Sequence, residues 1–302
     1  MKLLRLDCVL AAIDYDAAAR VVLDAAQALG AAGGADVHVV HVVHVEKEQS
    51  PARSTARQGV EEPADSAVAV LEQAHVQIDR SRVHVIAGEP ASVMCGLAER
   101  LDADVIVLGP HREHLEQEGQ LGGTALAIAT QASAPCLIVT HGIRLPLRRV
   151  LVPIDLSDTA RGALAVALAW SSALRGARSG GKANSPTRLT AMFVDRAEGA
   201  GRATPSARHA LEGELDRVRQ EAGSWAGVEI RGVTVASADA AGAIAERASA
   251  DDVDLIVLGT RGLGLDGAER RLGSVSADVS RRVDVPVLLV PPAVWSAISS
   301  GS

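Results

Sequence analysis

A glycine-rich loop near the end of the chain has residue types that bind phosphate. Gly259 and Gly262 follow an apolar run at 255–258, and Gly273 and Ser274 precede a stretch of helix length. Glycine lets the backbone approach an anion closely and take a positive φ. The free N–H groups and the dipole at a helix N-terminus also favour anions. The alternative interpretation is ordinary turn glycines with Ser274 as an N-cap.

The same loop also contains the spacing G-x-G-x-x-G at Gly262, Gly264 and Gly267. Only 35 residues follow Gly267, and Asp284 precedes the next apolar run instead of ending it. A dinucleotide-binding domain needs its ribose-binding acid at the end of that strand. The sequence G-x-x-x-x-G-K-[ST] does not occur. We therefore reject both a dinucleotide-binding site and a P-loop.

Other residues with catalytic or metal-binding potential form no known pattern. The sequence contains neither G-x-S-x-G nor H-E-x-x-H. His38, His41 and His44 could suggest a metal site, but on a strand of period two His41 faces away from the other two. We interpret all three as strand or surface histidines.

The glycine-rich loop belongs to the second copy of a sequence that the chain contains twice. Residues 102–109 read Asp-Ala-Asp-Val-Ile-Val-Leu-Gly, and residues 252–259 read Asp-Val-Asp-Leu-Ile-Val-Leu-Gly. Apolar runs that end at Asp14 and Asp155 open the two halves. A period of about 150 residues is far longer than the roughly 20 to 50 residues of a solenoid repeat. The chain therefore reads as a tandem duplication of one domain.

Each half alternates apolar runs with stretches of helical spacing. Continuous Val, Ile and Leu runs predict parallel strands buried on both faces, and right-handed crossovers then give a doubly wound α/β domain. In this architecture ligands bind at the carboxyl ends of the strands, where the strand order reverses. Asp14, Gly109, Asp155 and Gly259 all lie at such ends. The expected helices are 17–29, one after Asp65, 90–101, 160–174, 208–222, 240–250 and 275–282.

Composition restricts the partners and the compartment. A net charge of −7, with only one Phe, one Tyr and three Trp, argues against nucleic acid, which needs a positive surface or stacking platforms. The sequence contains no apolar run of 18 residues, so it predicts no membrane-spanning helix. Cys8, Cys95 and Cys136 form no C-x-x-C pair, which is typical of reduced thiols in a cytoplasmic protein.

We expect a first domain at 1–142, a second at 147–292 and a C-terminal tail at 293–302 that is frayed from Ser296. A polar connector at 141–149 joins the two domains, and 175–186 is a flexible insert in the second. The strand at 136–140 and the strand at 287–290 should pair, because exposed apolar edges need a partner.

Taken together, these motifs resemble the universal stress protein family. The resemblance rests on the strand-ending aspartate, on Gly-x-x-Gly followed by Gly-Ser, and on the closing Pro-Val-Leu-Leu-Val run at 286–290. It covers both halves and implies a five-stranded parallel sheet per domain with helices on both faces, of the adenine nucleotide α-hydrolase-like type. It also implies a cytoplasmic stress-response module, alone or as a homodimer, that binds ATP with or without Mg²⁺ and acts on a regulatory protein partner.

The resemblance assigns nucleotide contacts mainly to the second half. Asp155 matches an aspartate near the adenosine, Val194 matches the wall of the adenine pocket, and the loop glycines match the phosphate-binding segment. Asp155 could instead hold Mg²⁺ or act as a base near a bound triphosphate, but the resemblance favours a polar contact to ribose or adenine. The assigned residues are Pro153, Ile154, Asp155, Val194, Gly259, Arg261, Gly262, Gly273, Ser274 and Val275. Ten residues separate Gly262 from Gly273, where the family has nine, so this loop carries an insertion.

The first half departs further from the family pattern. Its weaker site comprises Asp14, Val42, Gly109 and Gly122. Arg112 replaces the second loop glycine, Pro110 lacks an N–H, and Gly123 stands where Ser or Thr is expected. Nearby glutamates would repel a polyphosphate. We expect this site to be degenerate or empty.

Two alternatives to a nucleotide-binding module stay open. One is a scaffold of the same fold that acts without nucleotide, and the other is a slow ATPase. The sequence offers no dedicated base for phosphoryl transfer, so we expect no fast turnover.

Overall fold

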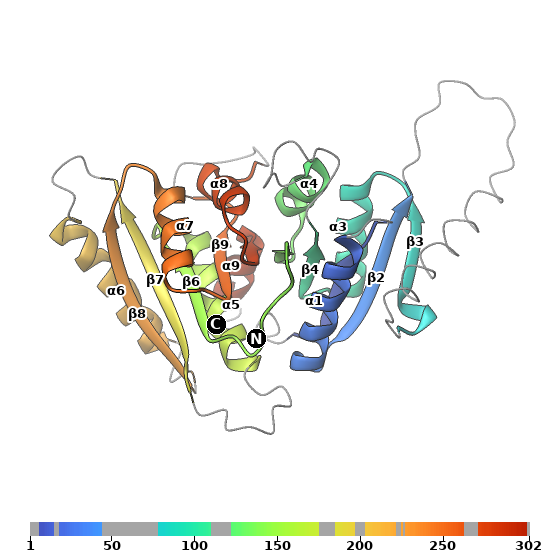
Figure 1. The fold of residues 1–302 in the computed structure, drawn as a ribbon, viewed down its shortest axis with the longest axis horizontal. Coiled ribbons are helices and arrows are strands. Elements are labelled where there is room, and N and C mark those ends of the chain that lie inside the picture. The colour runs from blue at the N-terminus through green and yellow to red at the C-terminus, as the bar shows by residue number, and fades with distance from the viewer. Residues whose placement is uncertain are drawn as a thin grey trace, which may run out of the picture.

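The two halves of the chain form one continuous ten-stranded sheet covered by helices (Figure 1). The computed structural model describes residues 6–14, 18–43, 78–109, 122–174, 185–196, 203–221, 225, 227–262 and 271–300. The helix expected after Asp65, most of the insert at 175–186 and the loop segments 110–121 and 263–270 lie outside the described residues.

The first half contains the elements that the apolar runs predict. They are β1 (Cys8–Ala12), α1 (Ala18–Gly33), β2 (Asp36–Val43), the 3₁₀ helix η2 (Arg80–Arg82), β3 (Val83–Ala87), α3 (Pro90–Leu101), β4 (Val105–Leu108), α4 (Gly123–Gln131) and β5 (Cys136–Ile138). Helix α3 has the bounds expected from the sequence, because Pro90 opens its first turn and the Glu89 side chain accepts hydrogen bonds from Ala91 N and Ser92 N. Proline at the first helical position is preset for helical φ.

The second half repeats this order among the described residues, with the α-helix α6 at the place of η2 and with α9 added after the last strand. Its elements are β6 (Arg149–Pro153), α5 (Asp158–Ala173), β7 (Thr187–Asp195), α6 (Pro205–Glu221), β8 (Val228–Ala236), α7 (Ala240–Ala250), β9 (Leu255–Gly259), α8 (Ser274–Arg282), β10 (Val287–Val290) and α9 (Pro292–Ser300). Among the described residues, no helix is both long enough and apolar enough to cross a membrane.

The strand order is β3-β2-β1-β4-β5-β10-β9-β6-β7-β8. Within each half, neighbouring strands are parallel, and the order reverses between β1 and β4 and between β6 and β9. This is the doubly wound arrangement that the sequence predicts. Strands β5 and β10 pair antiparallel, with Leu137 opposite Leu288. The predicted pairing of the two closing strands within the chain is therefore confirmed.

The core lies on both faces of the sheet, which explains why the strands are continuously apolar. Helices α1 and α5 cover one face, with buried residues such as Leu23 and Leu164, and α3, α4, α7 and α8 cover the other (Figure 1). Equivalent helices thus share a face, while equivalent strands run in opposite directions at the β5–β10 seam. The two halves are related by an approximate twofold axis perpendicular to the sheet.

The sequence predicts a tail at 293–302 that is frayed from Ser296. This prediction is wrong as far as Ser300, because residues 292–300 form α9. This helix packs on α5. The Val294 side chain is 1% exposed, and a Cβ atom added to Gly162 of α5 would lie 3.3 Å from Trp295 Cβ. Val294 and Ile298 lie one helical turn apart and contact the α5-side core. This i, i+4 spacing is the signal in the sequence that indicates a helix.

Candidate functional site

The strand order places the second-half candidate residues at one switch point. Strands β6 and β9 pair in parallel, with Val150 opposite Leu255 and Leu151 opposite Ile256. Asp155 follows β6, and Gly259 is the last residue of β9. Ligands of doubly wound domains bind in the crevice outside such carboxyl ends.

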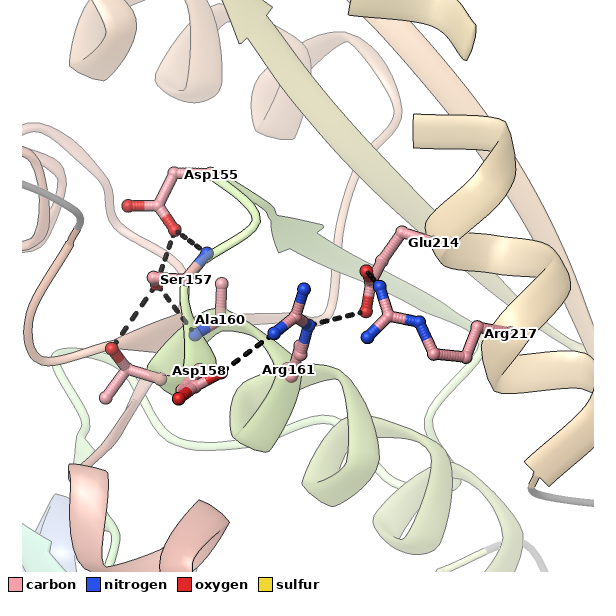
Figure 2. A network of polar contacts seen from close by, with 8 residues as sticks. Asp155, Ser157, Asp158, Ala160, Arg161, Glu214 and Arg217 are labelled. Atoms are coloured by element: carbon pink, nitrogen blue, oxygen red, sulfur yellow. Dashed lines mark hydrogen bonds and ion pairs between the residues drawn. The ribbon is translucent and has the colours of Figure 1, made fainter. Parts of the chain in front are cut away.

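The turn between β6 and α5 fixes the Asp155 carboxylate (Figure 2). Its Oδ1 atom accepts hydrogen bonds from Ser157 N at 3.0 Å and from Ser157 Oγ at 2.5 Å. Ser157 Oγ also accepts a hydrogen bond from Ala160 N at 3.2 Å and thereby caps α5. Between them, Leu156 has a φ of 67°, a left-handed conformation that costs free energy in a non-glycine residue and concentrates at functional sites. The turn thus holds one carboxylate oxygen in place.

The other carboxylate oxygen faces the glycine-rich loop. A Cβ atom added to Gly262 would lie 2.5 Å from Asp155 Oδ2, and one added to Gly259 would lie 2.9 Å from Thr159 Cβ. Neither glycine, nor Gly273, has a positive φ. The expectation that these glycines take positive φ is therefore wrong. Gly259 is required because the end of β9 lies directly against Thr159 of α5, and Gly262 is required because the loop lies against the Asp155 carboxylate.

Helix α8 begins against this loop. Gly273 is its N-cap, and within the described part of the chain no side chain accepts a hydrogen bond from its first turn. Gly273 N donates to Thr260 O at 2.8 Å, and Ser276 Oγ donates to Gly259 O at 2.7 Å. These two bonds fix the helix start beside the end of β9. Ser274 is the first helical residue and is exposed, so the alternative with Ser274 as the N-cap is wrong.

Sequence reasoning missed three hydroxyl side chains of this site. Thr159 Oγ1 donates to Arg261 O at 2.7 Å and ties the loop to α5. Ser157 holds Asp155, and Ser276 holds the end of β9, as described above. The signal that could have found the first two is the run Asp155-Leu-Ser-Asp-Thr159, in which small hydroxyl residues surround a helix start.

The apolar residues assigned to the nucleotide occupy the neighbouring strand ends. Pro153 and Ile154 are buried, and Ile154 N donates to Met192 O of β7 at 2.8 Å. Val194 is half-buried near the end of β7 and contacts the α7-side core. The structure therefore brings Asp155, the loop glycines and the α8 start together, with Val194 one strand away.

An ion-pair network anchors α5 behind the turn (Figure 2). Arg161 Nε donates to Glu214 Oε1 of α6 at 3.1 Å, and its Nη1 atom donates to Asp158 Oδ1 at 2.8 Å. Glu214 is 3% exposed and is also paired with Arg217. Although burial alone lowers the pKa of Arg161, the hydrogen bonds to the two carboxylates raise it above its ordinary value. This guanidinium therefore stays charged and holds α6 against α5.

The equivalent region of the first half encloses a cavity of about 150 Å³. Asp14, Val42 and Gly109 all line it, whereas Gly122 is the N-cap of α4 and does not. His41 also lines the cavity, with its Nδ1 atom 3.1 Å from Ile13 O. Typical ligand pockets have roughly 300 to 1,000 Å³, so this cavity is small. Arg112 and Pro110, on which the expectation of a degenerate site rests, lie outside the described residues.

Two of the three histidines discussed in the sequence, His38 and His41, lie on strand β2. His38 stacks on His84 of β3, with ring centroids 5.3 Å apart and His38 Nδ1 3.0 Å from His84 Nε2. His44 lies outside the described residues. Across the described parts of the chain, no three His, Cys, Asp or Glu side chains gather as a metal-binding group.

The chain has two doubly wound domains that are joined through their closing strands, and each domain has an aspartate at its switch point. This arrangement defines a class of tandem α/β proteins. The model of the universal stress protein family matches residues 7–140 and 146–291. The chain therefore belongs to the universal stress protein family and contains two copies of its domain.

Solved structures show the same fold at low sequence identity. A universal stress protein from Archaeoglobus fulgidus is 20% identical, with 95% of this chain and 99% of that chain covered and a TM-score of 0.69. A functionally unknown protein from Pseudomonas aeruginosa is 14% identical, with 99% of both chains covered and a TM-score of 0.62. A search of curated protein sequences gave no significant match.

Proposed function

We propose that this tandem universal stress protein is a regulatory or protective module whose second half binds ATP. The observation that carries the proposal is the convergence of Asp155, Gly259, Gly262 and the start of α8 at one switch point. Family resemblance suggests the adenine nucleotide, and the local geometry suggests how it would be held.

The phosphates would lie at the start of α8. Its first-turn N–H groups have no side-chain cap from the residues that the structure describes, and the helix dipole adds a partial positive charge there. A side chain at Gly262 would crowd the Asp155 carboxylate, and one at Gly273 would contact the loop backbone at 260–262. A phosphate group therefore fits the chemistry of this segment.

The adenosine would lie over the ends of β6 and β7. The Asp155 carboxylate, already oriented by Ser157, would accept a hydrogen bond from ribose or adenine, and Val194 would contact the base. The nucleotide, with or without Mg²⁺, would act as a signal of state and not as a fuel, because the sequence offers no dedicated base. The family resemblance suggests a cytoplasmic module, alone or as a homodimer, that presents its occupied form to a regulatory protein partner.

The test is calorimetric titration with ATP and Mg²⁺ of the wild type and of two matched variants. Asp155→Ala removes the second-half carboxylate, and Asp14→Ala removes its counterpart in the first half. We expect about one nucleotide per chain, at least tenfold weaker binding in Asp155→Ala and unchanged binding in Asp14→Ala, because a lost hydrogen bond to a charged group costs roughly 1.5 to 3 kcal/mol.

The matched variants also separate the alternatives. Loss in Asp14→Ala alone would move the site to the first-half cavity. Absence of binding in the wild type would favour the nucleotide-independent scaffold, and turnover above the order of 1 s⁻¹ would favour an enzyme. Gly262→Asp would be a less specific test of the loop, because its Cβ would lie 2.5 Å from Asp155 Oδ2 and disturb that carboxylate even without nucleotide.

A further inference from the structure

Three arginines lie on neighbouring strands away from the switch point: Arg149 and Arg188 at the amino ends of β6 and β7, and Arg231 as the fourth residue of β8. Arg149 is in register with Arg188, and Arg231 is in register with Thr190, two residues further along β7. Residues two apart on a strand share a face, so all three arginines are on the face that α7 covers. Together with the C-terminal end of α7, they line a cavity of about 240 Å³.

Arg188 has no partner for its charge within the described part of the chain. Its side chain is exposed and forms no hydrogen bond or ion pair there, although Glu229 is in register with it on β8. Arg231 differs, because its Nη2 atom donates to Asp251 Oδ2 at 2.7 Å and its Nε atom donates to Thr190 Oγ1 at 2.9 Å. Arg231 is therefore fixed in place, whereas the Arg188 guanidinium can turn toward the cavity.

Arg149 has a buried hydrogen-bond donor without an acceptor among the described residues. It is paired with Asp252, a carboxylate that also accepts a hydrogen bond from Arg144 at 3.0 Å. Its Nε atom is buried and has no acceptor among the described residues. A buried donor without an acceptor is unfavourable. An anion in the cavity would let this guanidinium turn and satisfy the donor.

The first half shows that the fold does not require this cluster. Alignment of the two halves through the strand register places Cys8 at the position of Arg149 and Asp36 at the position of Arg188, since Cys8 and Asp36 are in register in β1 and β2. Asp36 forms an ion pair at 2.8 Å with Arg82, which precedes β3. The first half therefore pairs its arginine, Arg82, with an aspartate, whereas the second half has three arginines in the equivalent region.

We propose that the arginine cluster Arg149, Arg188 and Arg231 binds a phosphoryl group, of inorganic pyrophosphate or of a nucleotide. The planar guanidinium group donates two parallel hydrogen bonds to phosphate oxygens. Arg188 supplies the charge without a partner among the described residues, Arg149 supplies the Nε donor that lacks an acceptor there, and Arg231 forms the fixed wall. The proposal is independent of the nucleotide site at the other end of the strands.

The test uses the arginine Nε–Hε resonances of the full-length ¹⁵N-labelled chain. Titration with pyrophosphate and, separately, with adenosine monophosphate should shift the signals of Arg149 and Arg188. Arg188→Asp, which copies the first half, should weaken binding at least tenfold and remove the Arg149 shift. Arg20→Ala is the matched control, since it removes a charge from α1, where Arg20 is 55% exposed and paired with Asp24.

The tighter of the two ligands identifies the source of the phosphoryl group. Unchanged affinity and an unchanged Arg149 shift in Arg188→Asp would overturn the proposal, as would the absence of any shift with both ligands. The same titrations on Asp155→Ala keep the two sites distinct, because this variant should lose ATP binding in calorimetry and keep the Arg149 shift with pyrophosphate. Circular dichroism of Arg188→Asp verifies that the exposed substitution leaves the fold intact.

Discussion

Replacing Gly259 with alanine tests the close contact between β9 and α5 on which the switch point depends. The new Cβ would lie 2.9 Å from Thr159 Cβ, 3.0 Å from Thr159 C and 3.1 Å from Thr159 O. Two of these three atoms are backbone, so the helix start must move by about half an ångström to restore ordinary contact. That movement would also stretch the hydrogen bond from Thr159 Oγ1 to Arg261 O, now 2.7 Å long.

The free energy of unfolding follows from two opposing effects. Overpacking of a well-packed site costs about 1 to 3 kcal/mol. Replacement of glycine also restricts the unfolded chain, which returns about 0.4 to 1 kcal/mol. We therefore expect Gly259→Ala to lower the free energy of unfolding by about 1 to 2 kcal/mol.

Urea unfolding followed by circular dichroism measures this change, with the slope m unaltered if only stability changes. Gly213→Ala is the matched control, because Gly213 is exposed on α6 and an added Cβ would meet nothing within 4 Å. The control should gain up to about 1 kcal/mol from helix propensity alone. If Gly259→Ala is as stable as this control, the reasoning from close packing is refuted.

Two further predictions concern pH and the seam between the halves. Burial lowers the pKa of both His38 and His84, and the charge of Arg82 lowers it further for His38, as the charge of His38 does for His84. Because the unfolded chain then takes up protons at a higher pH than the folded chain, the stability that these groups contribute should be complete above about pH 6.5. It should fall as the pH decreases toward the lower folded pKa values. Thermal melts from pH 7.5 to 5 should show a smaller decrease in His84→Gln, and an equal decrease would contradict this. Leu288→Ala, at a fully buried seam position, should lower the free energy of unfolding by about 2 to 5 kcal/mol and leave one unfolding transition for both halves. The control Leu126→Ala changes a side chain that is 37% exposed and should lower it little. Separate transitions for the halves would contradict a shared sheet.

The sequence predicts the strands and most helices because their signals are local. Continuous apolar runs mark strands that are buried on both faces, and this holds for β4 and β9, whose residues up to Leu108 and Leu258 are buried. Helices α3 and α7 have the expected bounds because each begins at a capping side chain, Glu89 and Asp239. The repeat then fixes the topology, because the two halves must fold alike.

The rest depends on distances that a sequence does not encode directly. The residues of the switch point were identified, but the reason for its glycines was not, because their need for space is set by how closely α5 approaches β9. The role of Thr159 follows from the same approach. The arginine cluster requires the register of three strands, in which Arg149, Arg188 and Arg231 are separated by about 40 residues each.

The antiparallel β5–β10 seam has a consequence for how this protein can diverge. A symmetric dimer of a single-domain chain would carry every substitution twice, once in each subunit, so its two sites could change only together. Here the linkage through residues 141–149 joins two separately encoded copies into the same sheet. Each copy can therefore acquire its own surface, as Asp36 and Arg188 illustrate at matching positions. Duplication in one chain makes specialisation of the two ends possible without loss of the shared core.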